Sequence, residues 1–137
     1  MTHSKGFESV VVPLEETPIS HIRDHTGERA GYGDNADIRR YFAGEPLYTA
    51  VHVVDGAPQE ERKYGIAHTH PFPEVNVLAG APGELVYRIR VGEEEREVES
   101  PAVIVIPPDV IHSANLVKGS GAFVVLRLTP EQLEDLM

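Results

Sequence analysis

The stretch HTHPFPE, residues 68–74, places two histidines and a glutamate within seven positions. His68 and His70 are two residues apart, so on an extended strand their imidazoles point to the same side. Pro71 and Pro73 lack the donor that a central strand needs, so the chain is expected to turn there. Glu74 then begins the next strand. If that strand pairs with the first, the three side chains converge on a divalent-metal site.

A fourth candidate ligand lies downstream in IPPDVIHSAN, residues 106–115. Pro107, Pro108 and Asp109 form a turn signal, and His112 opens a new strand three residues later. A histidine placed there can swing into the same end of a rolled sheet. The alternative is that these are ordinary surface histidines beside a salt-bridging glutamate, but the spacing of all four favours metal binding.

Together the two stretches resemble the paired motifs of the cupin superfamily. HTHPFPE supplies the H-x-H-x3-E core of the first motif, and Gly80 supplies its closing glycine one residue early. The second motif, P-x-G-x2-H-x3-N, is matched by PPDVIHSAN (107–115), with Asp109 in place of the glycine. Gly65 lies nearer to the histidines than the first motif asks. The resemblance covers roughly residues 48–128, and its departures all fall at turns.

This resemblance implies a double-stranded β-helix, or jelly-roll, barrel in which a metal is bound by His68, His70, Glu74 and His112. It also implies a homodimer. A small barrel with exposed edge strands favours the same state, because pairing with a second copy covers those edges. Whether the N-terminal segment swaps between the two subunits stays open.

The sequence beyond residue 46 has the pattern of an all-β domain. Its segments are short, mostly rich in β-branched or aromatic residues, and bounded by Gly, Pro or Asp turn signals. Because no helices intervene, they predict an antiparallel sandwich or barrel. The predicted strands are 47–54, 64–70, 74–80, 84–91, 96–100, 102–107, 112–117 and 122–128. The run AVIVI, residues 102–106, is apolar throughout and is predicted to be buried on both faces.

The two ends of the chain read differently from this middle part. Residues 1–45 are irregular and are expected to form an N-terminal extension packed on a barrel of residues 46–137, within a single domain. Inside the extension, Asp34 or Asn35 is predicted to cap a short helix over residues 36–42. The C-terminal TPEQLEDLM (129–137) predicts one short helix, with Thr129 as its N-cap.

Composition narrows the classes of partner and compartment. The 137 residues include no cysteine and carry a formal net charge of −10. Disulfides and thiolate metal sites are therefore excluded, and a cytoplasmic location is expected. The negative charge argues against nucleic acid and anionic membrane surfaces as partners, and leaves a small-molecule substrate open. No apolar run is long enough to span a membrane.

Several further residues are candidates for the site. His52 and Tyr48 share strand parity and are candidate catalytic residues that hold or move a proton, although a structural role for each is the alternative. Asn76 shares the parity of Glu74 and is expected to line the cavity. The roles of four arginines stay open between gripping an anionic substrate and lying on a solvated face. They are Arg39, Arg40, Arg88 and Arg90.

A site of three histidines and one glutamate suits Fe(II), Mn(II), Co(II), Ni(II) or Zn(II). The leading hypothesis is a metal-dependent enzyme that acts on a small oxygen-bearing metabolite. Non-haem iron dioxygenase-type oxidation, and hence Fe(II), is favoured. One alternative is a metal-assisted isomerase, lyase or decarboxylase in which His52 or a tyrosine moves the proton. Another is a non-catalytic cupin that binds a small ligand.

Overall fold

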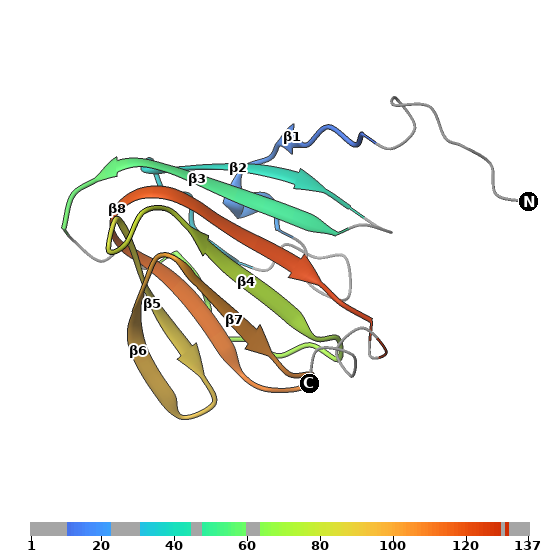
Figure 1. Cartoon of the computed structure of the whole chain (residues 1–137). Coiled ribbons are helices and arrows are strands. Elements are labelled where there is room, and N and C mark those ends of the chain that lie inside the picture. The colour runs from blue at the N-terminus through green and yellow to red at the C-terminus, as the bar shows by residue number, and fades with distance from the viewer. Residues whose placement is uncertain (1–10, 23–30, 45–47, 60–63, 130, 132–137) are drawn as a thin grey trace, which may run out of the picture.

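The computed structural model describes residues 11–22, 31–44, 48–59, 64–129 and 131, and it is almost entirely β (Figure 1). In chain order the elements are β1 (Glu15–Glu16), the 3-10 helix η1 (Ile19–His21), β2 (Ile38–Ala43), β3 (Thr49–Ala57), β4 (Glu74–Ala79), β5 (Leu85–Val91), β6 (Glu94–Glu99), β7 (Ala102–Ile106) and β8 (His112–Arg127). The predicted all-β class is confirmed. No helix among these residues is long and apolar enough to span a membrane.

β8 joins the two layers of the fold. Its C-terminal part pairs with β3 on one side and β4 on the other, within a sheet ordered β1-β2-β3-β8-β4-β7. Its N-terminal part pairs with β5, which carries β6 as a hairpin partner. All of these pairings are antiparallel. In Figure 1 the β5–β6 hairpin accordingly curls away from the larger sheet, and β8 runs through both.

Glycine allows β8 to bend between the layers. The sequence predicts two strands here, at 112–117 and 122–128, but the structure has one strand of 16 residues. Gly119 has a φ of 103°, a conformation that residues with a Cβ rarely adopt. A Cβ at this position would overlap the carbonyl oxygen of Glu84. The turn signal in the sequence therefore marks a bend within a strand rather than a break between two strands.

The core lies between the two layers. Leu85, Tyr87 and Ile89 occupy alternate positions along β5 and are buried. The ring of Tyr87 stacks on that of Phe123 from β8, with centroids 4.3 Å apart. Leu78 from β4 is fully buried beside them. Side chains on the inner face of the larger sheet that do not reach this core line a pocket instead.

The helix predicted over residues 36–42 is wrong, because this segment forms β2. The Asn35 side chain accepts a hydrogen bond from the Asp37 amide at 2.9 Å, which makes a local turn rather than a helix cap. Beyond the turn, Ile38 and Arg40 face inward while Arg39 is exposed, which is the period of a strand. β2 pairs along its whole length with β3, so these residues belong to the same sheet as the rest.

The expectation that AVIVI is buried on both faces is also wrong. Among the strands of the described residues, β7 pairs with β4 alone and is an edge strand. Its residues alternate, so that Ile106 is buried while Val103 is 63% exposed. The outer face of the larger sheet is thus apolar without being covered by other described residues of the chain. Apart from Thr129 and Glu131, the segment of the predicted C-terminal helix lies outside the described residues.

Candidate metal centre and pocket

The histidine pair lies on a loop that is fastened to β8, and not on the strand predicted over 64–70. The backbones of His68 and His112 form an isolated bridge, with N–O distances of 3.0 and 2.9 Å. The Asp109 amide donates to the His70 carbonyl at 2.8 Å. Glu74 begins β4, which pairs with β7 and β8 rather than with the histidine segment. The side chains nevertheless converge, because β8 lies next to both.

Residues from the two motifs lock this loop in place. The Asn115 side-chain oxygen accepts hydrogen bonds from the amides of Tyr64 and Gly65, at 2.9 and 2.7 Å. A Cβ on Gly65 would come within 2.6 Å of the Ala114 carbonyl oxygen, so a larger residue does not fit there. Asp109, which replaces the motif glycine, has a φ of 62° and keeps the left-handed turn. The departures from the motifs therefore leave the turn geometry intact.

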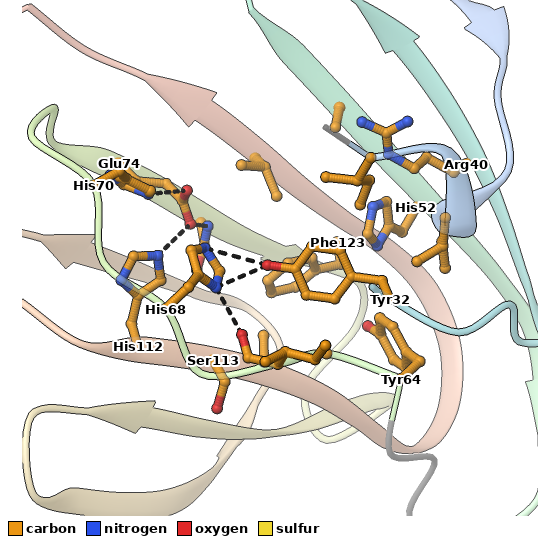
Figure 2. A pocket seen from close by; sticks show the side chains of 18 of the residues that line it. Tyr32, Arg40, His52, Tyr64, His68, His70, Glu74, His112, Ser113 and Phe123 are labelled. Carbon is orange, nitrogen blue, oxygen red and sulfur yellow. Dashed lines mark hydrogen bonds and ion pairs between the residues drawn. The ribbon is translucent and has the colours of Figure 1, made fainter. Parts of the chain in front are cut away.

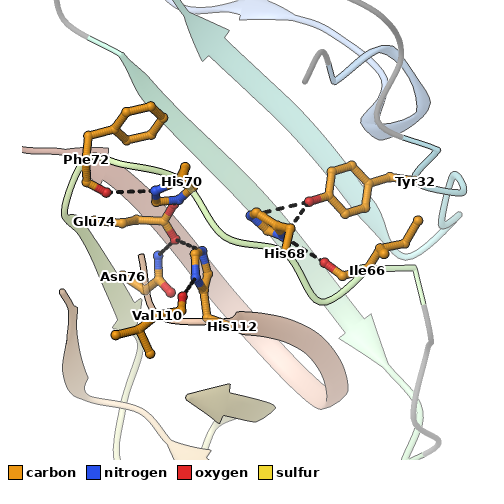
Figure 3. A network of polar contacts seen from close by, with 9 residues as sticks. All are labelled: Tyr32, Ile66, His68, His70, Phe72, Glu74, Asn76, Val110 and His112. Carbon is orange, nitrogen blue, oxygen red and sulfur yellow. Dashed lines mark hydrogen bonds and ion pairs between the residues drawn. The ribbon is translucent and has the colours of Figure 1, made fainter. Parts of the chain in front are cut away.

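Each imidazole is oriented by a backbone carbonyl two residues away (Figure 3). The Nδ1 atoms donate to the carbonyl oxygens of Ile66, Phe72 and Val110, at 2.7, 2.7 and 2.8 Å for His68, His70 and His112 respectively. Such a bond fixes the tautomer with the proton on Nδ1, so that Nε2 carries the lone pair that can bind a metal. One ligand atom from each of the three histidines lies within 4.8 Å of those of the other two. This is how ligands are held for a metal ion.

Glu74 completes the cluster from β4. Its two carboxylate oxygens lie 3.1 Å from His70 Nε2 and 3.8 Å from His112 Nε2. The Asn76 side chain donates to the second oxygen at 2.8 Å and holds the carboxylate in this position. Burial acts to raise the pKa of Glu74, but the close contacts of its carboxylate with His70 and Asn76 outweigh burial and leave the pKa below its usual value. The carboxylate is therefore ionised at neutral pH.

The spacing of the His70 and Glu74 ligand atoms suits a shared divalent ion. Two ligands about 2.1 Å from one ion and at right angles are roughly 3.0 Å apart, close to the His70–Glu74 contact. The Nε2 atom of His112 is buried and has no hydrogen-bond partner, which is costly unless something binds it. Burial lowers the pKa of His112, so its ring is a neutral donor. The structure thus groups the three predicted histidine ligands and places the fourth predicted ligand, Glu74, beside His70 and His112.

A cavity of about 250 Å³ opens beside these four residues (Figure 2). Both predicted catalytic candidates, His52 and Tyr48, line it. His52 is only 6% exposed, and burial followed by the charge of Arg40 lowers its pKa to about 3. Its imidazole is therefore neutral throughout the physiological range. Asn76 also lines the cavity, as predicted.

The structure divides the four arginines whose roles the sequence left open into one that lines the cavity and three that do not. Arg40 lines the cavity, whereas Arg39, Arg88 and Arg90 do not. Arg39 pairs with Glu16 at 2.9 Å on the exposed face, and Arg88 lies 3.5 Å from Glu97 on the β5–β6 hairpin. For these two, the solvated-face interpretation is supported.

Two cavity residues were not singled out from the sequence. The hydroxyl of Tyr32 lies 2.8 Å from Nδ1 and 3.5 Å from Nε2 of His68, so the phenol covers one side of that ring. Burial and the charge of Glu74 raise the pKa of Tyr32, which keeps it protonated. Arg127, at the end of β8, lies over the rings of Tyr48 and Phe72, at 3.4 and 3.9 Å. Alternation with Phe123 could have placed Arg127 inward, but no local pattern places Tyr32.

Comparisons with known proteins bear on the fold. No known family profile and no curated protein matches the sequence. An RmlC-like cupin from Shewanella frigidimarina aligns over 97% of this chain and 96% of its own, with a TM-score of 0.51 and 16% identity. KdgF from Halomonas sp. aligns over 74% and 91%, with a TM-score of 0.51 and 15% identity. A structure of FeII HppE aligns over 83% and 57%, with a TM-score of 0.50 and 15% identity.

Proposed function

The chain has the cupin fold, and we propose that it is a metal-dependent enzyme acting on a small oxygen-bearing metabolite. Dioxygenase-type oxidation is the favoured reaction. The observation that carries the proposal is the convergence of three imidazoles and the Glu74 carboxylate on the wall of a cavity of about 250 Å³. An ion held there would face a space of the size that a small metabolite needs.

Fe(II) is the favoured ion, with Mn, Co, Ni and Zn as alternatives. The donor set of nitrogen and carboxylate oxygen suits all five, so the ligands alone do not choose. The similarly folded HppE has been solved with FeII, which supports iron for this chain by analogy of fold. When bound, such an ion supplies redox or Lewis-acid chemistry to a substrate oxygen beside it.

The chain's own residues position and shield the reactants. The carbonyls of Ile66, Phe72 and Val110 hold the imidazoles, and the Asn76 amide holds Glu74. Phe123 and Tyr64 line the cavity and would exclude water from the side of a substrate that packs against them. Substrate bound against them would have its oxygen atoms directed at the ligand cluster.

The second candidate function is metal-assisted isomerisation, elimination or decarboxylation. It is favoured by His52, a neutral imidazole inside the cavity whose Nδ1 has no hydrogen-bond partner. Such a group is available to hydrogen-bond a substrate and to pass on a proton. Its low pKa makes it a weak base at neutral pH, which is why we rank this function below oxidation.

Metal analysis followed by oxygen uptake tests the proposal. The purified chain should contain close to one metal ion, and the His112→Gln variant should contain much less. With iron loaded, a panel of small hydroxy, oxo and phenolic acids should include one that drives oxygen consumption in the wild type only. A zinc, nickel or manganese protein that transforms a compound without oxygen would support the second candidate. A protein that carries one metabolite unchanged and turns nothing over would instead be a binding module.

A further inference from the structure

A second polar cluster lies inside the same cavity, away from the metal ligands. Arg40 on β2 and His52 on β3 are cross-strand partners, and both face inward. Arg40 is only 4% exposed and His52 only 6%. Figure 2 places the two residues together at one end of the cavity, with Glu74, His70 and His112 at the other.

Arg40 carries a buried charge that no described carboxylate balances. The ion pairs formed by described residues leave it out, and its Nε atom has no hydrogen-bond partner. Its guanidinium lies 4.4 Å from the ring centre of Phe42 and interacts with the Tyr48 side chain, and these two uncharged groups compensate only partly for lost water. Burial lowers its pKa, but a guanidinium remains protonated in a protein. A buried cation of this kind needs an anion.

The neighbouring Arg39 shows the usual alternative. It projects from the opposite face of β2, is well exposed, and forms a two-point hydrogen bond to Glu16 at 3.0 and 2.9 Å. The same strand thus presents one arginine paired within the chain and one facing the cavity. His52 beside Arg40 is neutral and has a free Nδ1, so it adds a hydrogen-bonding atom without adding a competing charge.

Apolar surface fills the space around this pair. Ile19 and Ile22 from the N-terminal segment and Phe123 from β8 line the same cavity. A fully polar anion such as inorganic phosphate would leave this surface uncovered. A carboxylic acid with a carbon chain or ring matches both the cation and the walls.

From this arrangement we propose that the substrate is a small carboxylic acid whose carboxylate is bound by Arg40 and His52, with its reacting oxygen directed at His68, His70, Glu74 and His112. The orientation toward the ligand cluster rests on the proposed function. The binding of a carboxylate at Arg40 does not require the metal, and can be tested without it.

Hexanoate and its uncharged counterpart hexanamide are suitable probes. They are titrated into the EDTA-treated full chain at pH 7.5, with calorimetry and the NMR resonance of the Arg40 Nε–H group as readouts. Hexanoate should bind and shift this resonance, whereas hexanamide should bind at least about tenfold more weakly. Arg40→Met should weaken hexanoate binding by about 10- to 100-fold, the loss expected for a charge-assisted contact. Arg40→Lys should retain part of the affinity.

Arg39→Met is the matched control, because it removes a guanidinium from the adjacent position on the outer face. It should change hexanoate binding less than about twofold. Equal binding of the acid and the amide, no binding of either, or unchanged binding by a folded Arg40→Met variant would overturn the inference. If Arg40→Met does not fold, the wild-type comparison and Arg40→Lys still decide. Failure of the proposed function would appear separately, as a wild-type chain that takes up no metal.

Discussion

The stability of the fold should fall in acid because His52 is buried in its neutral form, and His52→Gln should remove that part of the loss. The side chain is 6% exposed, and burial together with the charge of Arg40 lowers its pKa to about 3. In the unfolded chain the pKa of histidine is about 6.5. Glutamine keeps a polar side chain of comparable length that does not titrate.

The sign follows from where the protons bind. Between about pH 6.5 and pH 3 the unfolded chain takes up a proton at residue 52 and the folded chain does not, so acid favours unfolding. The contribution of His52 is fully present above about pH 6.5 and is lost progressively below it. At pH 5 the two pKa values give a loss of about 2 kcal/mol relative to pH 8.

Urea unfolding of the EDTA-treated chain at both pH values measures this quantity. Other groups also titrate in this range, but they contribute equally to both proteins and cancel when wild type and His52→Gln are compared. The free energy of unfolding should drop by about 2 kcal/mol more in the wild type than in the variant. His21→Gln, which removes an exposed histidine, should behave like the wild type. An acid-induced loss of the same size in wild type and His52→Gln would refute the reasoning.

Three further outcomes are expected. His70→Ala should lower metal affinity by more than about 100-fold while circular dichroism shows an unchanged fold, and full metal occupancy would contradict the assignment. Gly119→Ala should lower the free energy of unfolding in urea by at least about 2 kcal/mol, because the added Cβ meets the Glu84 carbonyl. The control Gly92→Ala has a φ of 63° and open space around it, so it should lower the free energy of unfolding by only about 1 kcal/mol. Equal losses in the two variants would refute the clash with Glu84. If the expected homodimer buries the apolar outer sheet face, Val103→Lys should shift it toward monomer in sedimentation equilibrium, and an unshifted dimer would place the interface elsewhere.

The candidate site could be predicted from the sequence because the spacing of residues along an extended chain determines which side chains point the same way. The two-residue spacing of His68 and His70 and the turns around them were sufficient to bring Glu74 and His112 into consideration. The predicted reason was partly wrong, since the histidine segment is a loop held by β8 and not a strand paired with β4. The four side chains still lie close together, because β8 contacts both the histidine loop and β4. Pairing partners depend on the whole sheet and cannot be recognised in a window of ten residues.

Local sequence signals were misleading where a helix and a turn before a strand can begin with the same residue type. Asn35 followed by a mixed apolar and charged run looks like a helix cap, yet the same side chain makes an equally good turn before a strand. Alternation of Ile38, Arg40 and Phe42 was the better signal, and it would have placed Arg40 inside. Tyr32 could not have been predicted, because its contact with His68 joins positions 36 residues apart without any repeating pattern.

The place of β8 in the sheet sets the order in which the chain can fold. β3 is rich in valine, and on one side it pairs with the C-terminal part of β8. The paired residues Val54 and Gly121 are 67 positions apart in the chain. At about 5–20 residues per second, a ribosome needs several seconds to supply that partner. During this interval β3 has an open apolar edge. Expression at low temperature or with chaperones present should therefore raise the yield of native chain more than substitutions around the pocket do. The reason is that aggregation through β3 threatens the chain during synthesis and not after folding.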